Sequence, residues 1–250
     1  MRKAFSPFCA LLVASTLLAA SHQPAFARQK HACAQDVVYP IQWEQMGAWQ
    51  FSYLGGDIPC ADLRGVTLQR IEKARAGGAR LYKTEVGQII DTDFNTATIY
   101  RSQIKMLSDV NLDFSEFREN VFVAASFSGV SIEDASLSET QFEAAHFSGV
   151  SFKSSWLSGV KIESSYLGGG TSFEGAILED VSFKGCSMTE VRFQGARMAN
   201  VDMRGVYFGG TDLRDVDLSG VDLRGAVYTN PARLPFSVEE AKSRGMVRGI

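Results

Sequence analysis

The chain has 250 residues, of which 45% are apolar and 21% charged, and its formal net charge is −3. This composition excludes an intrinsically disordered chain and is sufficient for one or two folded domains. The charge is uneven, because residues 108–228 carry 18 acidic and 9 basic side chains while the flanking segments are slightly basic.

Residues 1–27 have the pattern of a cleavable signal peptide. Two basic residues open the segment, an apolar run follows at 10–20, and residues 25–27 fit the small-x-small cleavage rule. The run is too short to span a bilayer comfortably, and the chain has no second long apolar stretch. We therefore expect cleavage after Ala27, a periplasmic or extracellular location and no transmembrane segment in the mature chain. The alternative is a buried first helix.

Residues 28–57 are rich in aromatic side chains. They include Tyr39, Trp43, Trp49, Phe51 and Tyr53. We expect this segment to cover the open end of the structure that follows; the alternative is a small ligand-binding surface.

Export would place the cysteines in an oxidising compartment. Cys33 and Cys60 both lie near the N-terminus, and we predict a disulfide between them. Such a bridge would close a short loop and contribute about 3 kcal/mol. Cys186 is then left over, and its surroundings indicate a small buried residue.

Residues 58–109 carry apolar residues at five-residue spacing, with interruptions. The spaced residues are Ile58, Leu63, Leu68, Ile89, Phe94, Ile99 and Ile104. The main interruption, at 69–88, contains the basic residues Arg70, Lys73, Arg75, Arg80 and Lys83. We expect it to be a solvated, partly helical excursion; the alternative is an anion-binding or membrane-surface patch. A second insertion follows around 106–109.

A bulky apolar residue recurs at every fifth position between 110 and 228, and we call these residues the centres. They are Leu112, Phe117, Phe122, Phe127, Ile132, Leu137, Phe142, Phe147, Phe152, Leu157, Ile162, Leu167, Phe173, Leu178, Phe183, Met188, Phe193, Met198, Met203, Phe208, Leu213, Leu218, Leu223 and Tyr228. A helix would scatter such positions around its circumference, and a flat strand would alternate them between two faces. A period of five therefore requires a corner in every repeat, as in a stacked solenoid.

The pattern resembles the pentapeptide-repeat family, whose motif is A(D/N)LXX. The segments 61–65 (Ala-Asp-Leu-Arg-Gly) and 221–225 (Val-Asp-Leu-Arg-Gly) match it closely. The resemblance covers about half of the chain. It implies an all-β solenoid, a right-handed, four-sided β-helix with four repeats per coil.

Four repeats per coil give six coils between 112 and 228, with residues twenty apart stacked. One residue is inserted at Gly168-Gly169-Gly170, after twelve repeats, and a corner can absorb it without shifting any column. The packed interior should leave no pore or ligand cavity. Four inward hydroxyl residues should hydrogen-bond the backbone at corners. They are Thr140, Ser155, Ser165 and Thr211.

Residues 229–250 have a different character. Pro231 and Pro235 end the repeats, Ser237 to Glu240 form a capping box, and Gly245 is a natural helix stop. We predict a short helix that covers the last coil. The alternative is a homodimer contact through the same end of the solenoid.

The sequence contains no motif that indicates catalysis. Neither a nucleophile elbow, a zinc-ligand helix nor a phosphate loop is present, and His146 has no cysteine or carboxylate at ligand spacing. We therefore predict no catalytic residues, no cofactor, no metal and no enzymatic activity.

Charged pairs flank several centres near the C-terminal end. The candidate docking residues are Asp202, Asp212, Asp217, Asp222, Arg204, Arg214 and Arg224. They predict either an electrostatic docking face or ladders of surface ion pairs between coils, each worth about 0–1 kcal/mol.

These observations lead to three functional hypotheses. The first is an exported structural or interaction module with an unidentified protein partner. The second, which the resemblance implies, is a DNA mimic that inhibits or protects a type II topoisomerase. Export and a charge density of about one per 3 Å, against about one per 1.7 Å in duplex DNA, weigh against mimicry, and direct nucleic-acid binding is not expected. The third, an enzyme within residues 28–107, has the least support.

Overall fold

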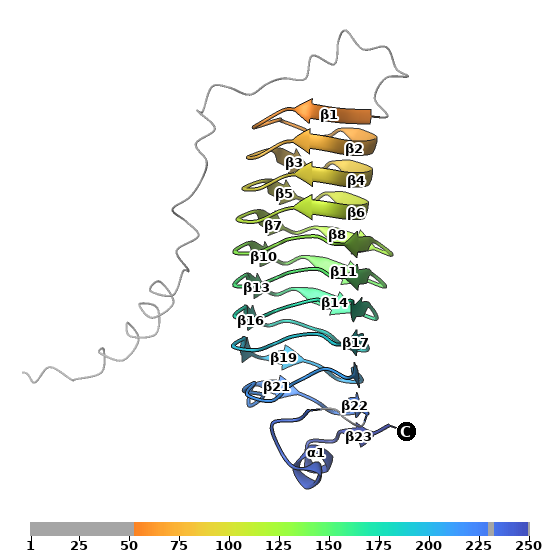
Figure 1. Cartoon of the computed structure of the whole chain (residues 1–250), viewed down its shortest axis with the longest axis vertical. Helices are drawn as coiled ribbons and strands as arrows, with labels where there is room; N and C mark the ends of the chain where they lie inside the picture. Colours follow the sequence, from red (N-terminus) through yellow and green to blue (C-terminus); the bar gives the residue numbers. More distant parts are fainter. Residues whose placement is uncertain (1–52, 230–232, 250) are drawn as a thin grey trace, which may run out of the picture. The chain divides into compact units, whose positions relative to one another are not determined.

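The computed structural model describes residues 53–229 and 233–249. They form stacked coils of short parallel strands, followed by a tail that contains one short helix (Figure 1). Each coil has four sides, and the chain visits them in the order A, D, B and C. The predicted four-sided β-solenoid is confirmed. The predicted signal peptide, residues 28–52 and Cys33 lie outside the described residues.

The strands of each side pair in parallel with those of neighbouring coils. Face A is an 11-stranded sheet of β1 (Tyr53–Asp57), β2 (Thr67–Arg75), β4 (Glu85–Asp93), β6 (Gln103–Asn111), β9 (Ser126–Ser128), β12 (His146–Ser148), β15 (Tyr166–Gly168), β17 (Ser187–Thr189), β20 (Tyr207–Gly209), β22 (Val227–Tyr228) and β23 (Val247–Arg248). Face B is a 7-stranded sheet of β3 (Arg80–Tyr82), β5 (Thr98–Tyr100), β7 (Glu116–Arg118), β10 (Ser136–Ser138), β13 (Trp156–Ser158), β16 (Ile177–Glu179) and β18 (Arg197–Ala199). Face C contains β8 (Val121–Val123), β11 (Gln141–Glu143), β14 (Lys161–Glu163), β19 (Val201–Asp202) and β21 (Val221–Asp222). Face D is a ladder of single bridges between Asn111 and Arg233.

The predicted register holds from Leu112 onward. Phe127 and Phe147, twenty residues apart, are paired, and their rings stack with centroids 5.0 Å apart. Leu167 pairs with Met188, which is twenty-one residues further on. The extra residue lies in the turn at Gly169-Gly170, so one corner absorbs it and the columns continue.

The N-terminal coils are shorter than the later ones and are not interrupted. Leu68 pairs with Val86, and Ile71 with Ile89, so this period is 18 residues. Each of these coils lacks one corner, because faces C and A are joined in the nine-residue strands β2, β4 and β6. The prediction of a partly helical excursion at 69–88 is therefore wrong. Its basic side chains are divided between β2 and the β3 region instead of forming one patch.

The centres form the core, as predicted. All are buried except Met198, which is half-buried. The inward hydroxyls bond the backbone at corners, as predicted: Ser155 donates to the Ile132 carbonyl at 2.6 Å and accepts from the Ala135 amide at 3.0 Å. No helix among the described residues is long and apolar enough to cross a membrane.

The thiol of Cys186 is buried in this core and donates to the Ile162 carbonyl at 2.8 Å. Burial raises its pKa to about 12, so thiolate is scarce at neutral pH. We expect a thiol reagent to label the native protein only as fast as the surrounding coils open. The labelling rate in increasing urea measures this, with Cys186→Val as the blank. Rapid labelling of the folded protein would contradict the buried position.

The C-terminal tail caps the last coil largely as predicted. Helix α1 (Val238–Ser243) begins at Ser237, whose side chain accepts from the Glu240 amide, and Gly245 follows it with φ of 78°. Ala241 is fully buried in the core, and β23 pairs with β22 at the edge of face A. The tail thus supplies both an apolar cover and an extra strand. A homodimer through this end stays a prediction.

Candidate functional site

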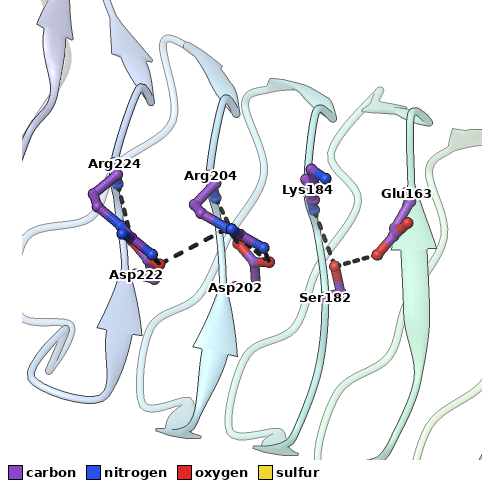
Figure 2. Close-up of polar contacts among 7 residues, drawn as sticks. All are labelled: Glu163, Ser182, Lys184, Asp202, Arg204, Asp222 and Arg224. Carbon is purple, nitrogen blue, oxygen red and sulfur yellow. Dashed lines mark hydrogen bonds and ion pairs between the residues drawn. The ribbon is translucent and has the colours of Figure 1, made fainter.

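Asp and Arg side chains form repeated clips near the C-terminal end of face C (Figure 2). In each clip the Asp directly precedes a centre and the Arg directly follows it, so both point outward from one repeat. Asp202 accepts from the backbone amide of Arg204 at 3.0 Å and from its guanidinium at 2.6 Å. Asp222 and Arg224 repeat this arrangement one coil later, at 3.1 and 2.6 Å.

The glycine after each arginine allows the chain to turn directly after a clip. Gly205 and Gly225 have φ of 66° and 71°, a region that is costly for residues with a Cβ. The sequence Asp-x-Arg-Gly therefore combines an outward ion pair with the corner that follows it.

The Arg–Asp ion pairs of the clips are short within one repeat and long between neighbouring coils. The contact between the Arg204 Nε and the Asp222 carboxylate is 3.8 Å long, against 2.6 Å within each clip. Toward the N-terminus, the side chain of Ser182 donates to Glu163 at 2.6 Å and continues the row without an arginine (Figure 2). The predicted ladders between coils are thus largely pairs within single repeats.

The seven predicted docking residues do not share one face, contrary to the prediction. Asp202, Arg204, Asp222 and Arg224 lie on face C, where Asp202 pairs with Asp222. Asp212 lies on face D, where Arg214 and Arg233 contact it at 2.7 and 3.1 Å. Asp217 lies on the side between these two and accepts from the Ser219 amide at 2.9 Å. With four repeats per coil, residues ten apart fall on opposite sides.

The Asp222 carboxyl should titrate well below the ordinary range of aspartate. Hydrogen bonds from the Arg224 side chain lower its pKa to about 2, because they favour the ionised form. Its contribution to stability is therefore complete above the unfolded pKa of about 3.9 and is lost as the pH falls through about 2. Arg224→Ala should raise this pKa toward the ordinary value in an NMR titration. Arg192→Ala, on face D, is the control, and an unchanged Asp222 midpoint in Arg224→Ala would contradict the clip.

Face A differs from the other sides because six of its consecutive strands lack charge. The strands β9, β12, β15, β17, β20 and β22 contain no Asp, Glu, Lys or Arg. Their outward residues are Ser126, Ser128, His146, Ser148, Tyr166, Gly168, Ser187, Thr189, Tyr207, Gly209 and Val227. The acidity of the repeats is therefore confined to the other three sides and the corners.

Two exposed tyrosines dominate the uncharged face. Tyr166 is 37% and Tyr207 43% exposed. Tyr166 leans over Gly168, and a Cβ at Gly209 would lie 3.0 Å from the Tyr207 ring, so the glycines make room for the rings. The His146 ring stacks on Tyr166 with centroids 4.7 Å apart. His146 thus faces outward, as predicted, and no group of three His, Cys, Asp or Glu among the described residues could hold a metal.

Of the predicted disulfide, only Cys60 is described. It is in a disulfide bond. Because Cys33 lies outside the described residues, the pairing stays a prediction.

The coils with the twenty-residue period match two family models for pentapeptide repeats, one over residues 162–234 and one over residues 125–163. The chain is a pentapeptide-repeat protein. Both matches begin beyond the 18-residue coils, which agrees with the change of period in the structure.

Solved structures of other pentapeptide-repeat proteins are similar to this chain. QnrB1, a plasmid-mediated fluoroquinolone resistance protein, is 18% identical with a TM-score of 0.48, and the match covers 70% of this chain and 93% of QnrB1. HetL, involved in heterocyst differentiation regulation in the cyanobacterium Nostoc sp., is 16% identical with a TM-score of 0.34, over 78% of this chain and 85% of HetL. A search of curated proteins found no match.

Proposed function

We propose that this pentapeptide-repeat protein is an exported, non-enzymatic interaction module that binds a protein partner through face A. The observation that carries the proposal is the run of six uncharged strands with Tyr166 and Tyr207 exposed. Protein interfaces are depleted of charge and enriched in tyrosine at their centres. A rigid sheet also loses little conformational entropy on binding.

The clips on face C are less suited to docking than the uncharged strands. Each guanidinium in a clip is already bonded to its own aspartate at 2.6 Å. A partner would have to desolvate these pairs or replace them, which gives little net gain. We therefore assign the clips to repeat stability and the binding role to face A.

Site-specific crosslinking tests the binding surface. A photoreactive amino acid is placed at Tyr207 on face A or at Lys161 on face C, in the organism that produces the protein. We expect one protein adduct from position 207, and its loss when Tyr166 is replaced by Arg. The same adduct from position 161, or its persistence in the Tyr166→Arg variant, would refute binding through face A.

Export is tested separately with a reporter joined after Ala27. We expect the reporter in the periplasm or the medium. Retention in the cytoplasm would favour the alternative of a topoisomerase-directed DNA mimic. The uncharged face weighs against mimicry, because duplex DNA presents phosphates along its whole length.

A further inference from the structure

A groove of about 300 Å³ lies on face B over β3, β5 and β7, far from the clips. We call it the tyrosine groove. It is lined by Arg64, Arg80, Leu81, Tyr82, Thr98, Tyr100, Glu116 and Arg118. Its volume is at the lower end of the range for small-molecule sites. It therefore suits a ligand of about one ring.

Two tyrosines from successive coils form one wall of the groove. Tyr82 and Tyr100 are register partners, and their ring centroids are 5.0 Å apart with planes tilted by 40°. Thr98, the small outward residue on the same strand as Tyr100, leaves room beside the rings. The wall is rigid, because both tyrosines stand on paired strands, and it offers apolar surface to a ring-shaped ligand.

Cationic side chains surround this wall. They are Arg64, Arg80, Lys83, Arg101 and Arg118, against the acidic residues Asp62, Glu116 and Glu119. Lys83 lies 5.4 Å and Arg101 4.9 Å from the centroids of the two tyrosine rings. The surplus of positive charge is small, which suits a single negative charge on the ligand better than a polyanion.

Three of these five cations are ion-paired, and of the other two, Lys83 and Arg80, Arg80 is the one that lines the groove. Arg64 is bound to Asp62 at 2.5 Å, and Arg101 to Glu119 at 2.6 Å. Arg118 shares the same Glu119 at 3.3 Å. The guanidinium of Arg80 has no hydrogen bond or ion pair among the described residues, although it lines the groove. Its donors are thus available to a carboxylate, which arginine binds in a bidentate manner.

Glu116 sets the direction of binding along the groove. It is the register partner of Thr98, on the far side of Thr98 from Arg80. A carboxylate on the ligand would be repelled at the Glu116 end and attracted at the Arg80 end. The ring would then lie against the tyrosine wall between them.

We propose that the tyrosine groove binds a six-membered ring that carries one carboxylate, with the carboxylate on Arg80 and the ring against Tyr82 and Tyr100. Sugar acids and aromatic carboxylates share this chemistry. The site is independent of the proposed protein interface, because it lies on a different face at the N-terminal end of the solenoid.

Titration of the full chain with glucuronate, benzoate and glucose tests the site, with tyrosine ring signals followed by NMR. We expect saturable binding of at least one of the two acids below about 10 mM, and at least tenfold weaker binding of neutral glucose. Tighter binding of glucuronate would indicate a sugar acid as the ligand, and tighter binding of benzoate an aromatic carboxylate. Equal binding of glucose, or no saturation with either acid, would overturn the proposal.

Variants of exposed residues assign the contacts without threatening the core. Arg80→Gln should weaken binding about tenfold or more, because it removes a charge-assisted pair. Glu116→Gln should strengthen it severalfold by removing the repulsion. Arg197→Gln, at the corresponding outward position near the other end of face B, is the matched control and should leave affinity unchanged. Unaltered affinity in Arg80→Gln would refute the assigned role of that residue and the site with it.

Discussion

Replacing Phe173 by alanine should lower the free energy of unfolding by about 3–5 kcal/mol. The side chain is fully buried, and it stacks between Phe152 and Phe193 with centroids 4.9 and 5.2 Å apart. The Phe183 ring packs against Phe173 in a T-shaped arrangement, with ring centroids 5.4 Å apart. Rigid strands above and below hold the neighbours in place, so the cavity cannot close by collapse.

Urea unfolding followed by circular dichroism measures this loss. Phe173→Leu should cost less than the alanine variant, because it retains most of the buried volume, and Val123→Ala, at a 58% exposed position, should cost about 0.5 kcal/mol or less. Each coil contacts only its neighbours, so the alanine variant should first unfold around its own coil. A loss below about 1 kcal/mol would mean that the stacked column does not determine stability.

The centres were predictable because every repeat places one large apolar residue inward. Phe127 and Phe147 illustrate this, since their spacing of twenty alone gives the column in which they stack. The effect of the inserted glycine was also predictable, because Leu167 and Met188 stay in the same column on either side of it. The local five-residue pattern and the overall fold agree here, because the chain turns at the same positions of the repeat in every coil.

The five-residue spacing does not predict the 18-residue coils, because they break the period of five without breaking the fold. Their signal is a pair of apolar residues three apart, as in Leu68 and Ile71, repeated every 18 residues. In the same coils Ala76 takes the place of a bulky centre and is fully buried, which hides the column further. Under a strict five-residue spacing, a strand that joins faces C and A therefore looks like an insertion.

The outward surfaces depend on which coil side a residue occupies, and this requires the correct period. The motif identifies the clip residues but not their faces, because Asp202 and Asp212 are ten residues apart and fall on different sides. Tyr82 and Tyr100 meet only because their coil has 18 residues. Sorting outward residues by their place in the coil would have revealed both the uncharged strands and the tyrosine groove.

The second large expected effect is at Asn120, which lies at the corner between faces B and C. This side chain is fully buried, its amide donates to the Ile99 carbonyl at 2.8 Å, and its oxygen accepts from the Ser102 amide at 2.9 Å. Asn120→Leu keeps the approximate volume but leaves a buried N–H and a buried C=O without partners. Each unpaired group costs about 1–3 kcal/mol, so we expect a loss of about 2–6 kcal/mol in the free energy of unfolding.

Asn120 also lies where the two kinds of coil meet. The residue above it, Ser102, is 18 positions away, whereas Thr140 on the other side is 20 away, so Asn120 joins the two kinds of coil. Thr140→Val is the matched control, because its hydroxyl donates only to Ser138 at 3.1 Å and its loss should cost about 1 kcal/mol. Hydrogen exchange of the Ser102 amide should accelerate in Asn120→Leu and not in Thr140→Val. Equal stability of the two variants would show that the backbone at this junction finds other partners, and that the change of period needs no dedicated side chain.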